Sequence, residues 1–340
     1  MNRGNSMFLV SASKKEKIRE LYQLKPIYNS VILLFFVIWG VAGSFTLQMP
    51  NLWSRVPGYL LSGIVLHALG IIMHEGIHSN LFRNQHARGR WANRWLGFLC
   101  GIPTLISITA YRAVHLTHHR FERGVEDPDE FENITRHPAL LKIVLLGWFL
   151  LGAYFYLFHI PITGMKLANR KGKKEIIQEY ILILLLPGLV FYLVPFRILA
   201  HIWLIPFLFT AQLAQVRGWA EHIFTSGDNP LTATRTVTSN RLVSFFMCNL
   251  NYHLEHHIYP GVPWYNLPQL HGLLLEDFRR AGASIYSSYI CYLWDVVKIL
   301  FSKIPKPEPI PKPTPHYYPH YMPILPIHKE EKETKPEIEI

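Results

Sequence analysis

Residues 30–78 read SVILLFFVIWGVAGSFTLQMPNLWSRVPGYLLSGIVLHALGIIMHEGIH, and this stretch decides the class of fold. Ser30–Met49 is 20 residues long and carries no charge, so a helix over it can cross a hydrocarbon core of about 30 Å. After a short connection, Val56–Met73 is again uncharged. The two runs predict a transmembrane helical hairpin, and a histidine-rich window follows directly at His74.

The composition supports a membrane protein. Of the 340 residues, 50% are hydrophobic and 17% are charged, against about 25% charged residues in an average soluble domain. The net charge of +11 favours either nucleic acid or an anionic membrane surface. Because long apolar runs are present, we expect the membrane and no nucleic-acid partner. Three widely separated cysteines exclude a disulfide scaffold and a thiolate metal site.

Basic segments set the expected topology. Residues 1–29 are basic, and the loop 166–174 carries five Lys or Arg residues, which assigns both segments to the cytoplasm. Tyr180–Phe196 and Ile198–Val216 then form a second hairpin that returns to the same side. We expect four crossings, with six as the alternative, and an active site on the cytoplasmic face.

Two further apolar runs determine whether the chain crosses the membrane four or six times. Trp95–Ala110 is short for a span, so we expect it to dip into the membrane. Ile143–Met165 must either enter and leave on one face or lie along the interface. The chain then divides into a basic cytosolic segment over 1–29, a membrane domain over 30–302 and a Pro-rich disordered tail over 303–340.

Three windows hold histidines at spacings of three or four residues, which on a helix places the imidazoles on one face. They contain eight histidines: His74 and His78; His115, His118 and His119; His253, His256 and His257. Imidazole ligands suit zinc, copper, iron and nickel. Eight ligands exceed the need of one ion, so two ions are implied. A redox-active iron pair explains the membrane setting better than zinc, because no general base breaks an unactivated lipid C–H bond.

The order HxxxH, HxxHH and HxxHH resembles the three histidine boxes of the membrane fatty acid desaturase superfamily. The similarity continues through residues 217–222, through the NYHLEHHIYP stretch at 251–260, and through 262–268 with His271. It covers roughly residues 33–275. The superfamily also includes sphingolipid desaturases and hydroxylases, and carotenoid ketolases and hydroxylases.

The resemblance implies an all-α integral membrane fold, with transmembrane helical hairpins below a cytosolic histidine-rich cap. It also implies a non-heme di-iron centre, with His222 as a ninth ligand. Six residues are candidates to orient the ligands through hydrogen bonds: Asn251, Glu75, Glu221, Glu255, Asp127 and Asp129. His67 shares a helix face with His74, but its place in mid-membrane favours a core or channel-lining role.

The expected activity is that of an O2-dependent fatty acid (acyl-lipid) desaturase, with two iron ions as cofactor and O2 as cosubstrate. The substrate is a membrane lipid or another long apolar molecule, and electrons come from a separate donor of ferredoxin or cytochrome b5 type. Carotenoid ketolases or hydroxylases and lipid hydroxylases are the alternatives within the superfamily. A zinc-binding or zinc-transporting membrane protein is the alternative from another class.

Overall fold

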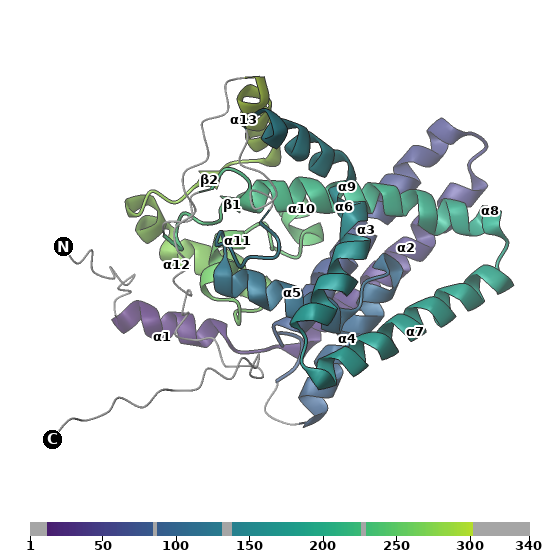
Figure 1. Ribbon diagram of the computed structural model, residues 1–340, viewed down its shortest axis with the longest axis horizontal. Helices are drawn as coiled ribbons and strands as arrows, with labels where there is room; N and C mark the ends of the chain where they lie inside the picture. The colour runs from purple at the N-terminus through teal and green to yellow at the C-terminus, as the bar shows by residue number, and fades with distance from the viewer. Residues whose placement is uncertain (1–11, 84–86, 131–137, 226–228, 302–340) are drawn as a thin grey trace.

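The computed structural model describes residues 12–83, 87–130, 138–225 and 229–301. The expected Pro-rich tail at 303–340 lies outside these residues, as does the beginning of the basic N-terminal segment. The proposed divisions at 29/30 and 302/303 therefore stay predictions. Within the described residues the fold is helical, as expected (Figure 1).

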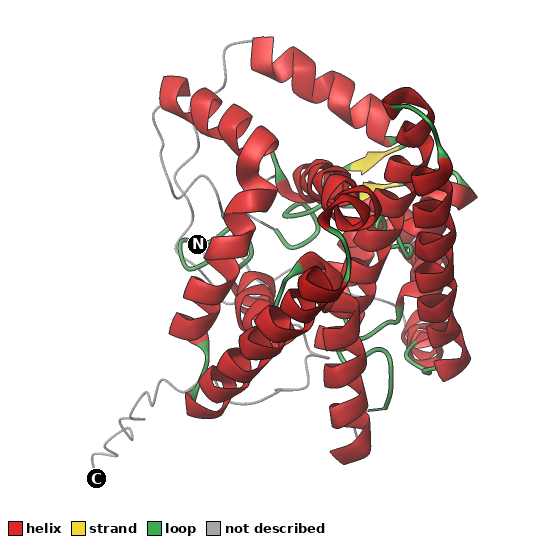
Figure 2. Ribbon diagram, turned by 90° about the vertical axis from the view of Figure 1, so that its right-hand side faces the viewer, coloured by secondary structure: helices red, strands yellow, loops and turns green. Residues whose placement is uncertain are grey.

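Helices follow one another along the chain with short connections. In order they are α1 (Ala12–Leu21), η1 (Pro26–Ser30), α2 (Val31–Gln48), α3 (Leu52–Ile77), α4 (Ala87–Gly101), η2 (Ile102–Thr104), α5 (Ile108–Phe121), α6 (Pro138–Leu167), α7 (Arg170–Leu193), α8 (Phe196–Leu199), the π-helical turn η4 (Ala200–Leu204), α9 (Ile205–His222), α10 (Arg241–Phe246), α11 (His253–Ile258), η5 (Trp264–Asn266), α12 (Leu267–Arg280) and α13 (Tyr289–Phe301). Two short strands, β1 (Thr236–Val237) and β2 (Ile285–Tyr286), pair in parallel beside the helices (Figure 2).

Four helical segments of the described chain are long and apolar enough to cross a membrane: Pro26–Gln48, Leu52–Ile77, Arg170–Leu193 and Phe196–His222. They correspond to the two predicted hairpins. Each is longer than the apolar run that predicted it, because the helix continues into polar residues at one or both ends. The second and fourth segments therefore include His74 and His222.

The apolar run at 95–110 does not form one straight helix. The segments Ala87–Thr104 and Ile108–Phe121 meet at an angle of 98°, and Leu105 at the bend has a left-handed backbone with φ of 61°. Ser107 caps the second segment by accepting a hydrogen bond from the Ala110 backbone at 3.0 Å. This geometry agrees with the expectation of a segment that dips into the membrane, although a broken span has the same shape.

The helix α6 contains the apolar run at 143–165 and does not reverse direction. A continuous helix excludes a turn within this run, and its place in the membrane stays a prediction, with four or six crossings. In Figure 1, α6 runs from top to bottom of the picture, across the direction of α7 and α9.

The core lies around α3, which packs against α2, α4 and α9. The contact with α9 is close because Gly63 has no side chain: a Cβ there would lie 2.7 Å from the Cβ of Phe209. The Thr210 hydroxyl donates to the Gly63 carbonyl at 3.0 Å. This contact fixes the register between the helices that carry His74 and His222.

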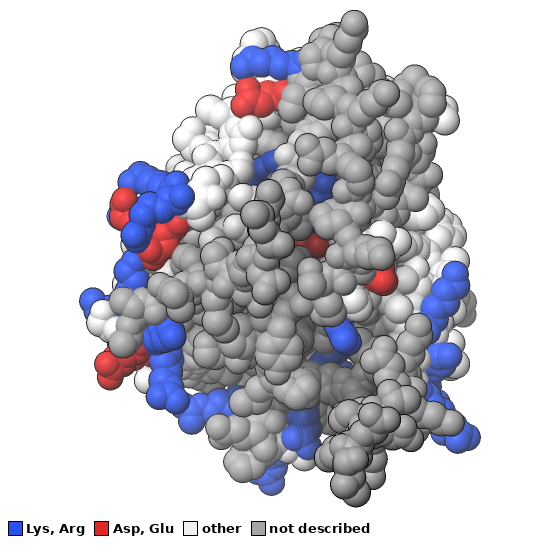
Figure 3. Space-filling view, turned by 60° about the vertical axis from the view of Figure 1, so that its left-hand side comes forward, with Lys and Arg blue, Asp and Glu red and all other residues white. Residues whose placement is uncertain are grey.

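Lys and Arg side chains are visible on the face in Figure 3 mainly along its left-hand, lower and right-hand edges, with a few nearer the middle. At the N-terminal end, α1 is attached to α12 by an ion pair between Lys14 and Asp277 at 2.5 Å. The amide of Asn266 also donates to the Leu21 carbonyl at 2.7 Å.

Candidate metal centre

Four helices bring the predicted histidines together. The last turn of α3 carries His74, and His78 follows it directly; α5 carries the second box, α9 ends at His222, and α11 is the third box. The start of α5 is held by the buried carboxylate of Glu179. That carboxylate accepts from the Ser107 hydroxyl at 2.6 Å and from the Thr109 backbone at 2.9 Å, and pairs with Arg94.

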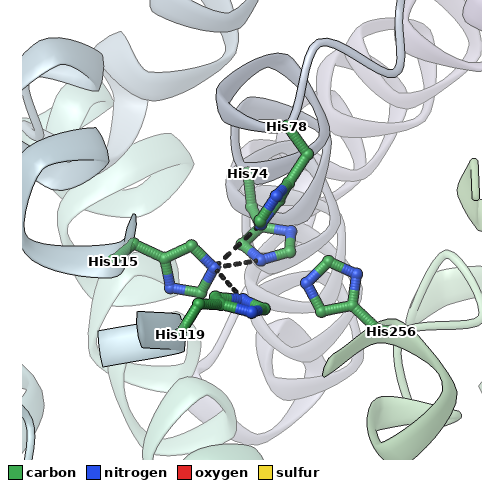
Figure 4. A group of neighbouring side chains, drawn as sticks. All are labelled: His74, His78, His115, His119 and His256. Carbon is green, nitrogen blue, oxygen red and sulfur yellow. Dashed lines mark hydrogen bonds between the residues drawn. The ribbon is translucent and has the colours of Figure 1, made fainter. Parts of the chain in front are cut away.

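The first cluster consists of imidazoles from all three boxes (Figure 4). One ring nitrogen from each residue lies within 4.8 Å of those of the others: His74, His78, His115, His119 and His256. In Figure 4 the five rings point toward a common space between α3, α5 and α11. The burial of these side chains shields that space from solvent.

The spacing around His115 argues for metal ligands rather than a hydrogen-bonded group. Its Nε2 atom lies 2.8 Å from Nε2 of His74, 3.0 Å from that of His78 and 2.9 Å from that of His119. A ring nitrogen of neutral imidazole is one donor or one acceptor, so three such contacts cannot all be hydrogen bonds. Neither ring nitrogen of the buried His256 has a hydrogen-bond partner among the described residues. Nitrogen atoms that converge without satisfying one another are what a bound cation requires.

A second cluster lies beside the first. His118, Glu122, His222 and His257 place one ligand atom each within 4.8 Å of the others, and His253 forms an overlapping group with His222 and Glu221. The rings of His119 and His257, one from each cluster, stack at 4.0 Å. Eight of the nine predicted histidines therefore belong to one of two adjacent groups, each compatible with a metal ion, and the ninth, His253, adjoins the second group through His222.

Three of the predicted orienting residues lie 3.0–3.9 Å from histidines of the clusters. Both carboxylate oxygens of Asp127 lie 3.0 Å from Nδ1 of His118. Glu221 lies 3.4 Å from Nε2 of His253, and Glu75 lies 3.9 Å from Nδ1 of His74. Asp127 therefore has the geometry of a hydrogen-bond acceptor for a ligating imidazole.

The other three predicted orienting residues have different partners. Glu255 accepts from His271 and from the Thr236 hydroxyl. The nearest histidine to Asp129 is His159, at 3.7 Å. The amide of Asn251 donates to the Val237 carbonyl at 2.9 Å. Glu255 and Asn251 therefore hold α11 and its approach in place, which positions the third box indirectly.

Sequence reasoning missed Glu122, which lies in the second cluster. Its carboxylate is 3.1 Å from Nδ1 of His257 and 3.7 Å from Nδ1 of His222. The signal was available in the sequence, because Glu122 follows His118 by four residues, the spacing that places two residues on one face of a helix, and it comes directly after the end of α5.

Burial disfavours the charged form of several of these imidazoles; His118 is the exception, because the Asp127 carboxylate outweighs burial and raises its pKa to about 10. Burial and the neighbouring imidazoles lower the pKa of His253 and His256 well below the ordinary value. Burial lowers the pKa of His78 from 6.5 to about 3. It also lowers the pKa of His257, with Glu122 opposing the shift. The neutral form is the one that binds a metal.

A cavity of about 230 Å³ adjoins both clusters, since His74 and His115 of the first and His118, His222 and His253 of the second line it. The lining that α3 and α9 contribute includes the apolar residues Ile71, Phe207, Ala211 and Ala214. Polar lining residues include Tyr111, Asp129, Tyr156 and Arg217. An amphipathic molecule with one polar end matches this lining.

Comparison with known proteins agrees with the geometry. The family model "Fatty acid desaturase" matches residues 50–289. The chain belongs to the fatty acid desaturase family. It is 30% identical over 303 residues to sphingolipid delta(4)-desaturase DES1 of Drosophila melanogaster, covering 84% of this chain and 85% of that protein. It is 24% identical to the human protein of the same name and 26% identical to the mouse protein, with the same coverage.

The family membership identifies the chain as an oxidoreductase that desaturates lipids, as predicted. Together with the four apolar helices it also makes the chain a membrane protein. The predicted alternative of a zinc transporter does not agree with this membership.

Proposed function

We propose that the desaturase is a di-iron, O2-dependent enzyme whose two irons are held by the nine histidines of the two clusters. The observation that supports this most strongly is the convergence of three imidazole nitrogens on Nε2 of His115 at 2.8–3.0 Å. Nitrogen ligands exclude neither zinc nor iron, but desaturation is an oxidation, and zinc has no redox chemistry.

The net reaction converts –CH2–CH2– into –CH=CH– and consumes O2, two electrons and two protons to give two molecules of water. The irons, when bound, would supply the activation of dioxygen. The chain's own residues hold the histidines and exclude bulk water, because the cluster lies in a buried space. They also align the lipid along the cavity beside His74, His115 and His222.

We further propose a sphingolipid as the substrate. Polar residues line the cavity next to the histidines: Tyr111 pairs with Arg217, and Tyr156 with Asp129. A lipid whose polar groups bind there would present carbons close to its head group to the metals. The relatives named as sphingolipid delta(4)-desaturases are the second line of support.

The predicted membrane arrangement fits this proposal. With both hairpins returning to one side, α3 and α9 deliver His74 and His222 to the same surface, which the basic loop at 166–174 assigns to the cytoplasm. A separate electron donor of ferredoxin or cytochrome b5 type would reach the irons from that face.

The proposal is tested by expression in a host that makes saturated sphingoid bases and lacks an enzyme that desaturates them. We expect new unsaturation in sphingoid bases, with unchanged fatty acids and, in a strain that accumulates β-carotene, unchanged pigment. His118→Ala and His256→Ala should abolish the product. The control His201→Ala alters a histidine held by Tyr59 and Arg55 outside both clusters and should retain it. Unsaturation confined to fatty acids, or oxidised pigment, would contradict the sphingolipid assignment.

A further inference from the structure

Two buried polar side chains line the apolar part of the cavity without a role in either cluster. His67 on α3 and Gln215 on α9 both border the cavity, and each is 6% exposed. Among the described residues neither side chain has a hydrogen bond. Buried polar groups are nearly always paired, so a pair of this kind facing a cavity indicates a ligand that supplies the missing partners.

The two residues lie at the same depth. His67 precedes His74 by seven residues, and Gln215 precedes His222 by seven residues. Seven residues make two helical turns, or ~10 Å along each axis. The hydrogen bond from Thr210 to Gly63 brings the two helices together one turn further from the clusters, so the register of the helices agrees with this placement.

The chemistry of the two side chains defines what they can bind. An uncharged imidazole has one donor and one acceptor, and a glutamine amide has both. The nearby wall is formed by Gly70, Ile71, Ala211 and Ala214. The charged residue closest along the chain is Arg217, which also lines the cavity, and its guanidinium is paired with the Glu221 carboxylate at 3.4 Å. The surroundings therefore favour an uncharged group that donates and accepts at once, which is the property of a hydroxyl.

We propose that His67 and Gln215 form a subsite for a hydroxyl group on the lipid chain, two helical turns from the metal-binding histidines. The inference rests on the proposed desaturase function, since it assigns the cavity to the lipid. It predicts that the enzyme distinguishes chains with a hydroxyl at this depth from plain chains.

The test uses the full chain in detergent and a series of dihydroceramides of equal length. One is plain, and each of the others carries a single hydroxyl at a successive carbon of the chain to be desaturated. We expect kcat/KM to be highest for one hydroxyl position, by roughly 5- to 10-fold over the plain chain, as for one buried neutral hydrogen bond. Iron content is measured in parallel.

The variants His67→Phe and Gln215→Met keep the side-chain volumes and remove the hydrogen-bonding atoms. Each should reduce the preference to about one while keeping the iron content. The control Gln212→Met makes the same change on α9, where the amide donates to the Leu150 carbonyl instead, and it should keep the preference. If one variant protein fails to accumulate, the other is sufficient for the test.

Equal rates for all chains in the unaltered protein would overturn the proposal, as would a preference that survives both substitutions. A preference that survives both substitutions is expected if His67 and Gln215 bind a water molecule and do not contact the lipid chain. Absence of desaturation on every dihydroceramide, plain ones included, would instead overturn the proposed function.

Discussion

Both carboxylate oxygens of Asp127 lie 3.0 Å from Nδ1 of His118. The carboxylate also accepts from the backbone amides of Arg123 and Asp129. The loop after α5 is thus wrapped around the carboxylate that fixes the orientation of this imidazole. Nε2 of His118 is left for the second cluster.

Replacing Asp127 by Asn should weaken the second metal position. The amide cannot accept through both atoms, so His118 loses its fixed orientation, and loss of such an outer contact costs roughly 10- to 100-fold in metal affinity. The measurement is the iron retained against a chelator series. Glu126→Gln changes the exposed carboxylate next to it and serves as control. Equal iron retention in Asp127→Asn and the control would show that the contact does not orient a ligand.

Filling the cavity should stop the reaction without removing iron. Gly218 borders the cavity one turn before His222, and a Cβ there would meet no atom within 4 Å. Gly218→Leu is therefore expected to lower product formation at least ~10-fold, because the side chain occupies space needed by the lipid. Gly188→Leu makes the same change at an exposed glycine of α7 with open space around it. Full activity in Gly218→Leu would show that the lipid does not use this cavity.

The free energy of unfolding of the metal-free protein should decrease as the pH is lowered. The pKa of His78 is lowered by burial from 6.5 to about 3, and the pKa values of His253 and His256 are lowered as well. Below pH 6.5 the unfolded chain takes up protons that the folded chain does not bind until about pH 3. Between pH 6.5 and about pH 3, each such histidine lowers the free energy of unfolding by up to ~1.4 kcal/mol per pH unit.

The check is thermal unfolding of chelator-treated protein from pH 7.5 to 5. The unfolding temperature should drop with pH, and the quadruple variant that replaces His78, His253, His256 and His257 by Gln should show a shallower slope. Parallel slopes for the two proteins would mean that these histidines do not titrate on unfolding.

The sequence predicted the helical hairpins and eight of the clustered histidines, because apolar runs and spacings of three or four residues have direct geometric meanings. The ninth, His222, was predicted from the family resemblance alone. The division into two clusters could not be predicted. His118 and His119 go to different clusters, as do His256 and His257, since neighbours on a helix point about 100° apart. Which cluster each joins depends on how α3, α5, α9 and α11 pack.

Contacts between segments far apart in the sequence could not be predicted either. The partner of Glu255 is His271, and the anchor of α5 is Glu179 on α7. No local pattern connects these residues. The Pro-rich tail gives a compositional signal alone, and its role stays a prediction.

The central claim is that two irons occupy the two histidine clusters. It is tested most directly by metal analysis of the purified full chain after expression in iron-replete medium, together with His256→Ala and His118→Ala. We predict about two irons per chain in the unaltered protein and less iron in each variant, because the first removes a ligand of one cluster and the second a ligand of the other. Zinc at full occupancy without iron, or an iron content that neither substitution changes, would contradict the account.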